Sequence, residues 1–525
     1  MATALSASRA SLSSVLRSPA AISSARGSHS EHRGLSFWMH RVLEELANVR
    51  SSPDSDAVHD LRVAIRRCRS LASVMEEVDP DPAWPEMRKV ARKLFRGLGA
   101  LRDAQVMIEW VKKLGSELDP LRARLVSTLE AEEKDSRANA LRIVGKFDEK
   151  DWKRLERHLR QRARLVPAGS LAAECLALER HERARDLHAR ALRTAKAKPW
   201  HASRIGLKRF RYTVEGLLPE RYALWGENLK RLQDLLGDIH DLDVLAGLVK
   251  DSLSTESSES PEVWLEKVAR ERKQRIEIYR HLTLGKTSLW NEWRHGLPRG
   301  ERLEAAVMAR LRATARAADP NPRRTAKISR SALAIFDAFR RAHAAPVFQE
   351  LAIRSLLQAA ALLHGVGDAL DSKSPHKAAR EFLLSLAPPP HWAAEEWDHL
   401  AWIVRFHRGA EPKSNKGTFA KLSEEQQKTV RALAGVLRLA RALRKSGLDT
   451  ASGLRAESSA DTVTLRIPGW IDTVETAARL AVAKHLLETY LEKTLILTGA
   501  VKAKKIITLP PKEMEPEEVS LAASD

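Results

Sequence analysis

Cysteine is almost absent from this chain of 525 residues, which contains only Cys68 and Cys175. Two thiols cannot build a disulfide framework or a cysteine-rich zinc site, and such scarcity is typical of a reducing compartment. Aromatic residues are also scarce, at 5%. No apolar run reaches the roughly 18 to 20 residues that a membrane-spanning helix needs. The composition argues against a disulfide-rich secreted protein and a membrane-spanning protein, and we expect the cytoplasm.

Negative charge is in deficit, because 89 Lys and Arg face 68 Asp and Glu, giving a net charge of +21. Such an excess attracts nucleic acid, an anionic membrane or another polyanion. Hydrophobic residues make up 43% and charged residues 30%, which is typical of a globular protein. Because Ala, Leu, Arg and Glu dominate long stretches, we predict an all-α fold with a small α+β segment near the end.

The basic residues form a pattern that occurs twice. In each copy a histidine is followed by three basic residues, at steps of three, four and three. The first copy is His59, Arg62, Arg66 and Arg69, and the second is His201, Arg204, Lys208 and Arg211. On a helix these steps place four side chains along one stripe, roughly 15 Å long. Like charges at this spacing repel by a few tenths of a kcal/mol per pair. The repetition predicts a long anion lying along the stripes. The alternative is that these Arg-rich helix faces are solvated surface or pair with Asp and Glu.

The repeat continues beyond each stripe. Its further parts are Arg92 and Lys93, which correspond to Lys230 and Arg231, and residues 98–103 (LGALRD), which correspond to residues 236–241 (LGDIHD). Each copy is therefore predicted as a stripe helix, a second basic helix ending near Leu-Gly, and a third helix opening with Arg-Asp or His-Asp. Two such copies should pack as helical bundles related by a pseudo-two-fold axis. If both stripes face that axis, they form one basic channel.

These motifs resemble the CHAD domain, the conserved-histidine α-helical domain. The resemblance rests on residues 58–69 (VHDLRVAIRRCR), residues 201–212 (HASRIGLKRFRY) and the two Leu-Gly turns. It implies two four-helix bundles around a basic pore that binds inorganic polyphosphate. Carried over by position, the polyphosphate-binding residues are His59, Arg62, Arg66, Arg67, Arg69, Arg92, Arg96, His201, Arg204, Lys208, Arg209, Arg211 and Lys230. One departure is His240, which stands where the first copy has Arg102.

Two aspartates, Asp103 and Asp241, are expected in the first turn of a helix. A carboxylate is favoured there by the helix dipole and orients a neighbouring cation, so we predict a structural role. The alternative is that they hold a divalent ion against phosphate.

The C-terminal half resembles the C-terminal region of exopolyphosphatases and guanosine-pentaphosphate phosphohydrolases, over about residues 325–500. The matching pieces are residues 362–367 (LLHGVG), 374–384 (SPHKAAREFLL), 403–408 (IVRFHR), 422–426 (LSEEQ) and 436–443 (VLRLARAL). A catalytic HD site needs an adjacent His and Asp plus further ligands around a metal. Here Gly365 follows His364, and Ala378 stands at a usual His position. We therefore predict no metal site, and Lys377, Arg405, His407 and Arg408 are either a basic surface or solvated charges.

The predicted organisation has five parts. They are a disordered tail (1–34, with an organelle transit peptide as the alternative for residues 1–30), a CHAD domain (35–290, with repeats at about 35–165 and 175–290), a helix and linker (291–324), an HD-like domain (325–500) and a flexible tail (501–525). Within the HD-like domain we expect strands at 462–467 and 494–498 around a helix at 474–491.

The predicted function is non-catalytic binding of inorganic polyphosphate, without a cofactor, in the cytoplasm and at polyphosphate granules. Two alternatives remain. One is nucleic-acid binding, although only Phe210 and Tyr212 lie near the stripes to stack on bases. The other is a metal-dependent phosphohydrolase that uses His364.

Overall fold

The structure is a computed structural model that describes residues 34–52, 54–252, 261–414, 417–448, 453–470 and 473–499. Apart from Gly34, the predicted tails lie outside the described residues, as does the question of a transit peptide. The chain divides into two compact units after Ala313. Almost all described elements are helices, so the all-α prediction is confirmed.

The first unit is built from helices alone. They are α2 (Leu35–Ser51), α3 (Ser55–Met75), α4 (Ala83–Gly97), α5 (Gly99–Leu114), α6 (Pro120–Gly145), α7 (Glu149–Ala163), α8 (Leu171–Leu192), α9 (Ala197–Leu217), α10 (Pro219–Asp251), α11 (Pro261–Thr283), α12 (Leu289–His295) and α13 (Gly300–Ala318), of which α13 continues into the second unit. Several begin at a side-chain cap, such as Asp54, which accepts a hydrogen bond from the Ala57 amide at 2.8 Å. Such caps satisfy amides that the first helical turn leaves unpaired, and so fix where each helix starts.

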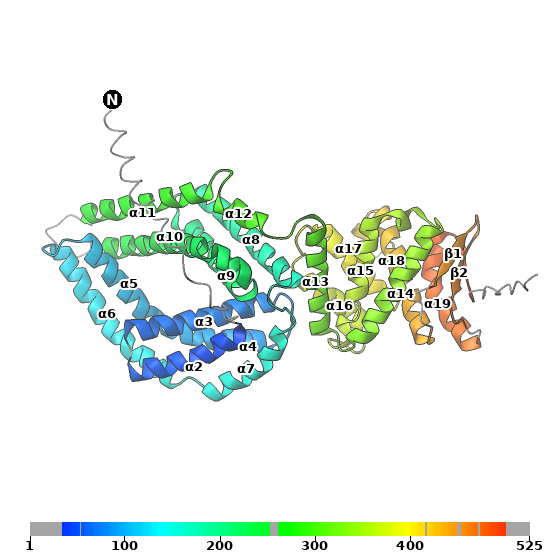
Figure 1. Cartoon of the computed structure of the whole chain (residues 1–525), viewed down its shortest axis with the longest axis horizontal. Coiled ribbons are helices and arrows are strands. Elements are labelled where there is room, and N and C mark those ends of the chain that lie inside the picture. Colours follow the sequence, from blue (N-terminus) through cyan, green and yellow to red (C-terminus); the bar gives the residue numbers. More distant parts are fainter. Residues whose placement is uncertain are drawn as a thin grey trace, which may run out of the picture. The chain divides into compact units, whose positions relative to one another are not determined.

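The predicted repeat is visible in the packing of these helices. In the first copy α2 packs on α3, α3 on α4 and α5 on α6; in the second, α8 packs on α9, α9 on α10 and α10 on α11. The corresponding helices of the two copies also meet, because α3 contacts α9 and α5 contacts α10. In Figure 1 α3 and α9 converge toward their C-terminal ends, where Arg67 of α3 pairs with Glu215 of α9. The two stripe helices are therefore neighbours.

One part of the repeat prediction is wrong. The first copy breaks at Leu98 between α4 and α5, but α10 runs through Leu236 and Gly237 without a break for 33 residues. At Gly97 the chain lies against Ile143 of α6 so closely that an added Cβ would stand 2.3 Å from Ile143 Cδ1. At Gly237 an added Cβ would meet nothing within 4 Å. The sequence motif is therefore shared, but only the first copy ends a helix there.

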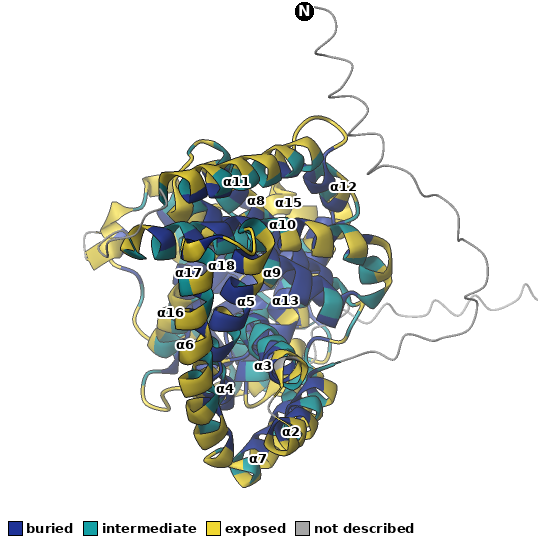
Figure 2. Ribbon diagram, turned by 90° about the vertical axis from the view of Figure 1, so that its left-hand side faces the viewer, coloured by how far each residue is buried: buried dark blue, intermediate teal, exposed yellow. Residues whose placement is uncertain are grey.

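The two copies share one hydrophobic core, which α5 and α6 of the first copy build together with α10 and α11 of the second. Met107 and Trp110 of α5 pack with Leu125 of α6, Leu242 of α10 and Trp264 of α11. The Trp264 indole also donates to Asp119 Oδ2 at 2.7 Å, so its polar edge is satisfied. Figure 2 shows that α6 and α11 nevertheless keep long exposed faces, as outer helices of the unit.

The second unit holds helices and a small sheet. Its elements are α14 (Pro322–Arg341), η2 (Pro346–Gln349), α15 (Leu351–Leu363), η3 (Val366–Asp368), α16 (Pro375–Ser385), α17 (Ala394–Phe406), η4 (Gly417–Lys421), α18 (Glu424–Lys445), β1 (Arg455–Ser458), β2 (Thr462–Ile467), α19 (Val474–Leu491) and β3 (Thr494–Gly499). Strand β2 lies between an antiparallel β1 and a parallel β3, with Val463 opposite Leu495. The strands at β2 and β3 and the helix between them are as predicted, whereas β1 was not predicted.

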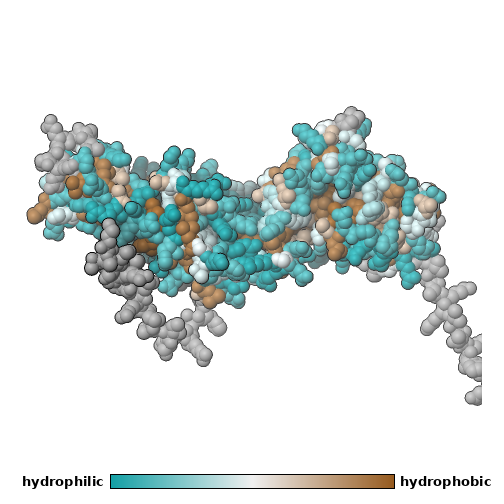
Figure 3. Space-filling view, turned by 90° about the horizontal axis from the view of Figure 1, so that it is seen from above, coloured by the Kyte–Doolittle hydropathy of each residue, from teal (hydrophilic) through white to brown (hydrophobic). Residues whose placement is uncertain are grey.

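Hydrophilic residues predominate on the face shown in Figure 3, and hydrophobic residues form small patches between them. Among the described residues, no helix is both long and apolar enough to cross a membrane.

Candidate functional site

The first stripe lies on α3, opposite the apolar residues that anchor this helix. Val58, Leu61 and Ile65 are fully buried, whereas Arg66 and Arg69 are half-buried. The helix therefore presents its basic residues along the side that the core does not use.

A single aromatic ring gathers three arginines of this stripe. The guanidinium carbons of Arg62, Arg69 and Arg66 lie 4.2, 5.0 and 5.9 Å from the centre of the Phe95 ring. Arg62 also donates through Nη1 to the Phe95 carbonyl oxygen at 3.1 Å. The negative face of the ring attracts each cation, which offsets part of their mutual repulsion. Phe95 was missed from the sequence, where the only signal is an aromatic residue between Arg92 and Arg96 on the second basic helix.

Helix α4 extends the positive surface. Burial lowers the pKa of Arg69 to about 10, and the charges of Arg92, Arg88 and Arg96 act in the same direction. Among the described residues, Arg66, Arg69, Arg92 and Arg96 form no ion pair. These cations therefore face one another without neutralisation.

The second stripe, on α9, faces the first. Burial lowers the pKa of Lys208 well below its usual value, and the next causes are the charges of Arg204 and Arg66. Burial likewise lowers the pKa of Arg204, on which Arg66 also acts. Arg66 Nη1 donates to the Tyr212 hydroxyl of α9 at 3.2 Å, which links the two helices directly. The structure thus brings the middle of both stripes together.

Two carboxylates stand opposite these cations. Asp103 acts on Arg62 and Arg204, and Asp241 acts on Arg204 and Lys208. Burial raises the pKa of Asp241 to about 6, against the opposing influence of Arg204 and Lys208. Asp241 lies in the middle of α10, so the prediction that it occupies a first helical turn is wrong. Asp103 is the fifth residue of α5 and also lies beyond the first turn.

The histidines differ between the copies. His201 and His240 lie with their Nδ1 atoms 3.3 Å apart, one donating and the other accepting. Burial lowers the pKa of His240 to about 4, with Arg204 and His201 as further causes. In the first copy Arg102 stands at the position of His240 and acts on His59. Burial lowers the pKa of His59, and the charge of Arg102 is the next cause. The second copy therefore holds a neutral pair where the first holds a permanent cation.

Four predicted site residues have other surroundings. Arg67 forms an ion pair with Glu215 of α9 at 2.6 Å and stacks over Trp38. Arg211 is buried and donates to the Tyr222 hydroxyl at 3.2 Å. Lys230 pairs with Asp234 one turn along an exposed face at 2.8 Å, and Arg209 is exposed. Arg67 and Arg211 hold helices together, which leaves the facing stripes without them.

In the second unit, His364 and His407 are buried with their rings 5.2 Å apart. Each ring Nδ1 lies close to a carbonyl oxygen one turn back, Ala361 for His364 at 2.8 Å and Val404 for His407 at 2.5 Å. Burial lowers the pKa of His364 to about 4. A Cβ on Gly365 would stand 2.6 Å from Thr325 Oγ1 and 2.7 Å from Asp319 Oδ2, so a larger residue there would have to displace these side chains. In the described part of the chain no three His, Cys, Asp or Glu side chains gather as metal ligands.

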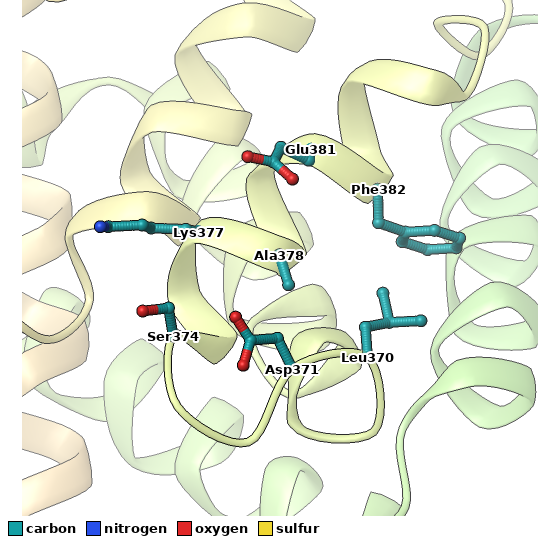
Figure 4. A pocket seen from close by; sticks show the side chains of 7 residues that line it. All are labelled: Leu370, Asp371, Ser374, Lys377, Ala378, Glu381 and Phe382. Atoms are coloured by element: carbon teal, nitrogen blue, oxygen red, sulfur yellow. The ribbon is translucent and has the colours of Figure 1, made fainter.

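A pocket of about 560 Å³ lies beside α16, and Figure 4 shows the residues that line it: Leu370, Asp371, Ser374, Lys377, Ala378, Glu381 and Phe382. The amine of Lys377 points away from Leu370 and Phe382. With two carboxylates and one amine, the lining does not suit a polyanion.

Comparison with known proteins agrees with both predicted resemblances. The CHAD domain family model matches residues 38–250, and the model of Ppx/GppA phosphatase, domain III, matches residues 313–488. The crystal structure of the CHAD domain from the plant Ricinus communis is 22% identical and covers 50% of this chain and 88% of its own, with a TM-score of 0.34. A comparison with curated proteins finds no match. On the two family matches, the chain contains a CHAD domain followed by a domain of the Ppx/GppA phosphatase domain III family.

Proposed function

We propose that the CHAD domain binds inorganic polyphosphate, without catalysis, along the facing stripes of α3 and α9. The observation that carries this proposal is that Arg66 on one helix acts on both Arg204 and Lys208 on the other. A folded protein keeps such repulsion only where another requirement outweighs it, and an anion lying between the helices would remove it.

The balance of charge favours a polyanion over a single phosphate. The two stripes and α4 contribute seven basic side chains, which are those of Arg62, Arg66, Arg69, Arg92, Arg96, Arg204 and Lys208. The carboxylates that act on this group are Asp103 and Asp241. Guanidinium groups present planar donor forks that match phosphate oxygens, and a chain of phosphates can meet them in succession. The CHAD family match supports the same ligand class.

The aromatic residues of the site favour polyphosphate over nucleic acid. Single-stranded nucleic acid is held by bases stacked on accessible rings. Here the Phe95 ring is surrounded by arginines, and Tyr212 is buried against Arg66 and Arg67. Neither ring is placed to receive a base.

The proposal assigns no enzymatic activity to the second unit. Its family match is to domain III alone, and Gly365 stands where an HD pair would have its aspartate. Both cysteines are buried free thiols, which supports a cytoplasmic location and, with the ligand, the surface of polyphosphate granules.

The test is calorimetric titration of the full chain with long-chain polyphosphate at two salt concentrations. We expect tight binding that weakens with salt, because each neutralised phosphate releases counterions. The double variant Arg62→Glu with Arg204→Glu should bind at least about a hundredfold more weakly, since charged hydrogen bonds contribute about 1.5–3 kcal/mol each. Arg157→Glu with Arg160→Glu, on the exposed face of α7, makes the same charge change away from the stripes.

Circular dichroism must show unchanged helix content in both double variants. If the buried Arg62 proves necessary for folding, Arg66→Gln with Lys208→Gln tests the same contact between the helices. Unaltered binding in a folded stripe variant would refute the channel. Single-stranded RNA that displaces polyphosphate as effectively as polyphosphate displaces RNA would put nucleic-acid binding first.

A further inference from the structure

Four cations of the second unit come together from three different elements. Arg324 lies in the first turn of α14, Arg408 follows the end of α17, and Arg441 and Lys445 stand one turn apart on α18. Helix α18 packs against both α14 and α17, which brings these ends together. The charges acting on Arg441 include those of Arg408 and Arg324, and those acting on Lys445 include all three arginines. We call these four residues the α18 cluster.

The α18 cluster is poorly neutralised. Asp368 forms an ion pair with Arg408 at 3.2 Å and also acts on Arg441. In the part of the chain that the structure describes, the side chains of Arg324, Arg441 and Lys445 form neither an ion pair nor a hydrogen bond. Burial lowers the pKa of Arg441 to about 10, with Arg408 and Arg324 as the next causes. One carboxylate thus faces four cations, one of which is held partly away from water.

Arg438, which lies close to the α18 cluster in the sequence, has a structural role and serves as a comparison. Arg438, one turn before Arg441 on the same helix, donates to the carbonyl oxygens of Phe406, Gly409 and Ala410 at 2.7, 2.9 and 3.2 Å. These bonds fix the segment that carries Arg408. Arg441 makes no such bonds, so its position next to Arg408 is not explained by support of the backbone.

Two unsatisfied polar atoms belong to residues near Arg408. Arg405 Nη1 and His376 Nδ1 are buried without a hydrogen-bond partner among the described residues. Burial lowers the pKa of His376 to about 4, and Arg405 and Arg408 are the next causes. A buried guanidinium N–H, such as that at Arg405 Nη1, is costly unless something accepts a hydrogen bond from it. An oxyanion at the cluster would supply acceptors and negative charge together.

We propose that the α18 cluster binds a compact phosphate-type oxyanion, such as a pyrophosphate unit. The cations converge from three elements instead of following one helix, and Arg441 and Lys445 are separated by about 6 Å of helix rise. That arrangement suits two or three adjoining phosphates, unlike the long facing stripes of the CHAD domain. The anion could be the end of a polyphosphate chain or a free small phosphate, and both present the same oxygens. This site does not depend on polyphosphate binding by the first unit.

The test uses the full chain with the stripe variant Arg62→Glu and Arg204→Glu, titrated with pyrophosphate. We expect saturable binding that weakens at least tenfold on Arg441→Gln and is unchanged by Arg330→Gln, an exposed arginine on α14. Arg324→Gln, at an exposed position, gives a second variant that should weaken binding even if Arg441→Gln disturbs folding. Absence of pyrophosphate binding, or binding that neither Arg441→Gln nor Arg324→Gln weakens, would overturn the proposal.

Long-chain polyphosphate distinguishes the two sources of the anion. If the stripe variant still binds polyphosphate chains and pyrophosphate competes with them, the cluster takes chain ends; if only pyrophosphate binds, it takes free small anions. Full retention of long-chain binding in the stripe variant, with loss on Arg441→Gln, would refute the CHAD channel while supporting the α18 cluster. The two proposals therefore fail in different ways.

Discussion

The two copies of the CHAD repeat have the same spacing of basic residues but different chemistry. In the first copy Phe95 gathers three arginines, and His59 lies beside Arg102. In the second copy Gln233 stands at the position of Phe95, and His201 lies beside His240. The first copy is thus charged at nearly every pH, while Lys208, Asp241 and the histidines make the second sensitive to protons. A repeated motif can fix where cations stand and still leave each copy its own electrostatics.

The largest expected difference between the two copies is in how they tolerate a substitution at the glycine of the shared Leu-Gly motif. Gly97→Ala should lower the free energy of unfolding by about 1–3 kcal/mol, because its Cβ would collide with Ile143. Gly237→Ala should raise it by about 0.5–1 kcal/mol, because the residue lies in an unobstructed helix. Urea denaturation measures both. Ile143→Ala in the Gly97→Ala chain should recover part of the loss, and equal effects at the two glycines would contradict the difference between the copies.

The two copies should also differ in their response to pH. We expect the pH dependence of polyphosphate affinity to come from the second copy. Without ligand, the pKa of Asp241 is about 6 and that of His240 is about 4. An anion bound beside these two side chains raises both pKa values, so binding takes up protons. Affinity for polyphosphate should therefore rise as pH falls from 7.5 to 5.5, by up to about tenfold per pH step of one for each proton taken up. Titrations at constant ionic strength measure this.

Asp241→Asn should bind more tightly at pH 7.5 and lose much of this pH dependence. The same substitution at Asp234, on the exposed face of α10, is the matched control. The groups that face Asp241 are Arg204, Lys208, Asp238 and Asp103, and those that face His240 are Arg204, His201 and Lys208. A pH dependence that survives Asp241→Asn unchanged would assign it to the histidines.

The smallest effect on polyphosphate affinity should come from removing the aromatic ring of Phe95. Phe95→Leu keeps an apolar side chain but removes the aromatic face, so the three arginines lose about 0.5–1 kcal/mol of attraction for each exposed contact. We expect polyphosphate affinity to fall a few-fold, measured by calorimetry. Gln233→Leu, at the corresponding position of the second copy, should leave affinity unchanged. A similar loss in both variants would mean that Phe95 acts only by packing.

Much of the fold could be predicted because helical periodicity is local. In the strand–helix–strand segment, for example, residues 462–467 alternate and residues 474–491 carry strong helix formers, and both elements have the expected bounds. The unbroken α10 could not be predicted, because the two Leu-Gly motifs look alike in sequence and only the packing differs: Gly97 lies against Ile143, which is distant in sequence, whereas Gly237 has no such neighbour. Strand β1 was missed because its four residues carry no alternating pattern of their own.

The candidate site was predictable as a set of residues but not as a set of roles. Spacing identified the stripes, and the structure places Arg66 against Arg204 and Lys208. The same spacing could not show that Arg67 pairs with Glu215, or that Phe95 lies under three arginines, since each contact joins different helices. The α18 cluster had no signal as a whole, because its members lie on three elements.

The contact between α3 and α9 also bears on how the domain folds. Beside the Arg67–Glu215 ion pair, Gly216 of α9 lies so close to Leu71 of α3 that an added Cβ would stand 2.4 Å from Leu71 Cδ2. Each copy thus completes the other's packing where the two meet. We therefore expect the CHAD repeat, although duplicated in sequence, to unfold as one cooperative unit, so that both walls of the proposed site form in the same step.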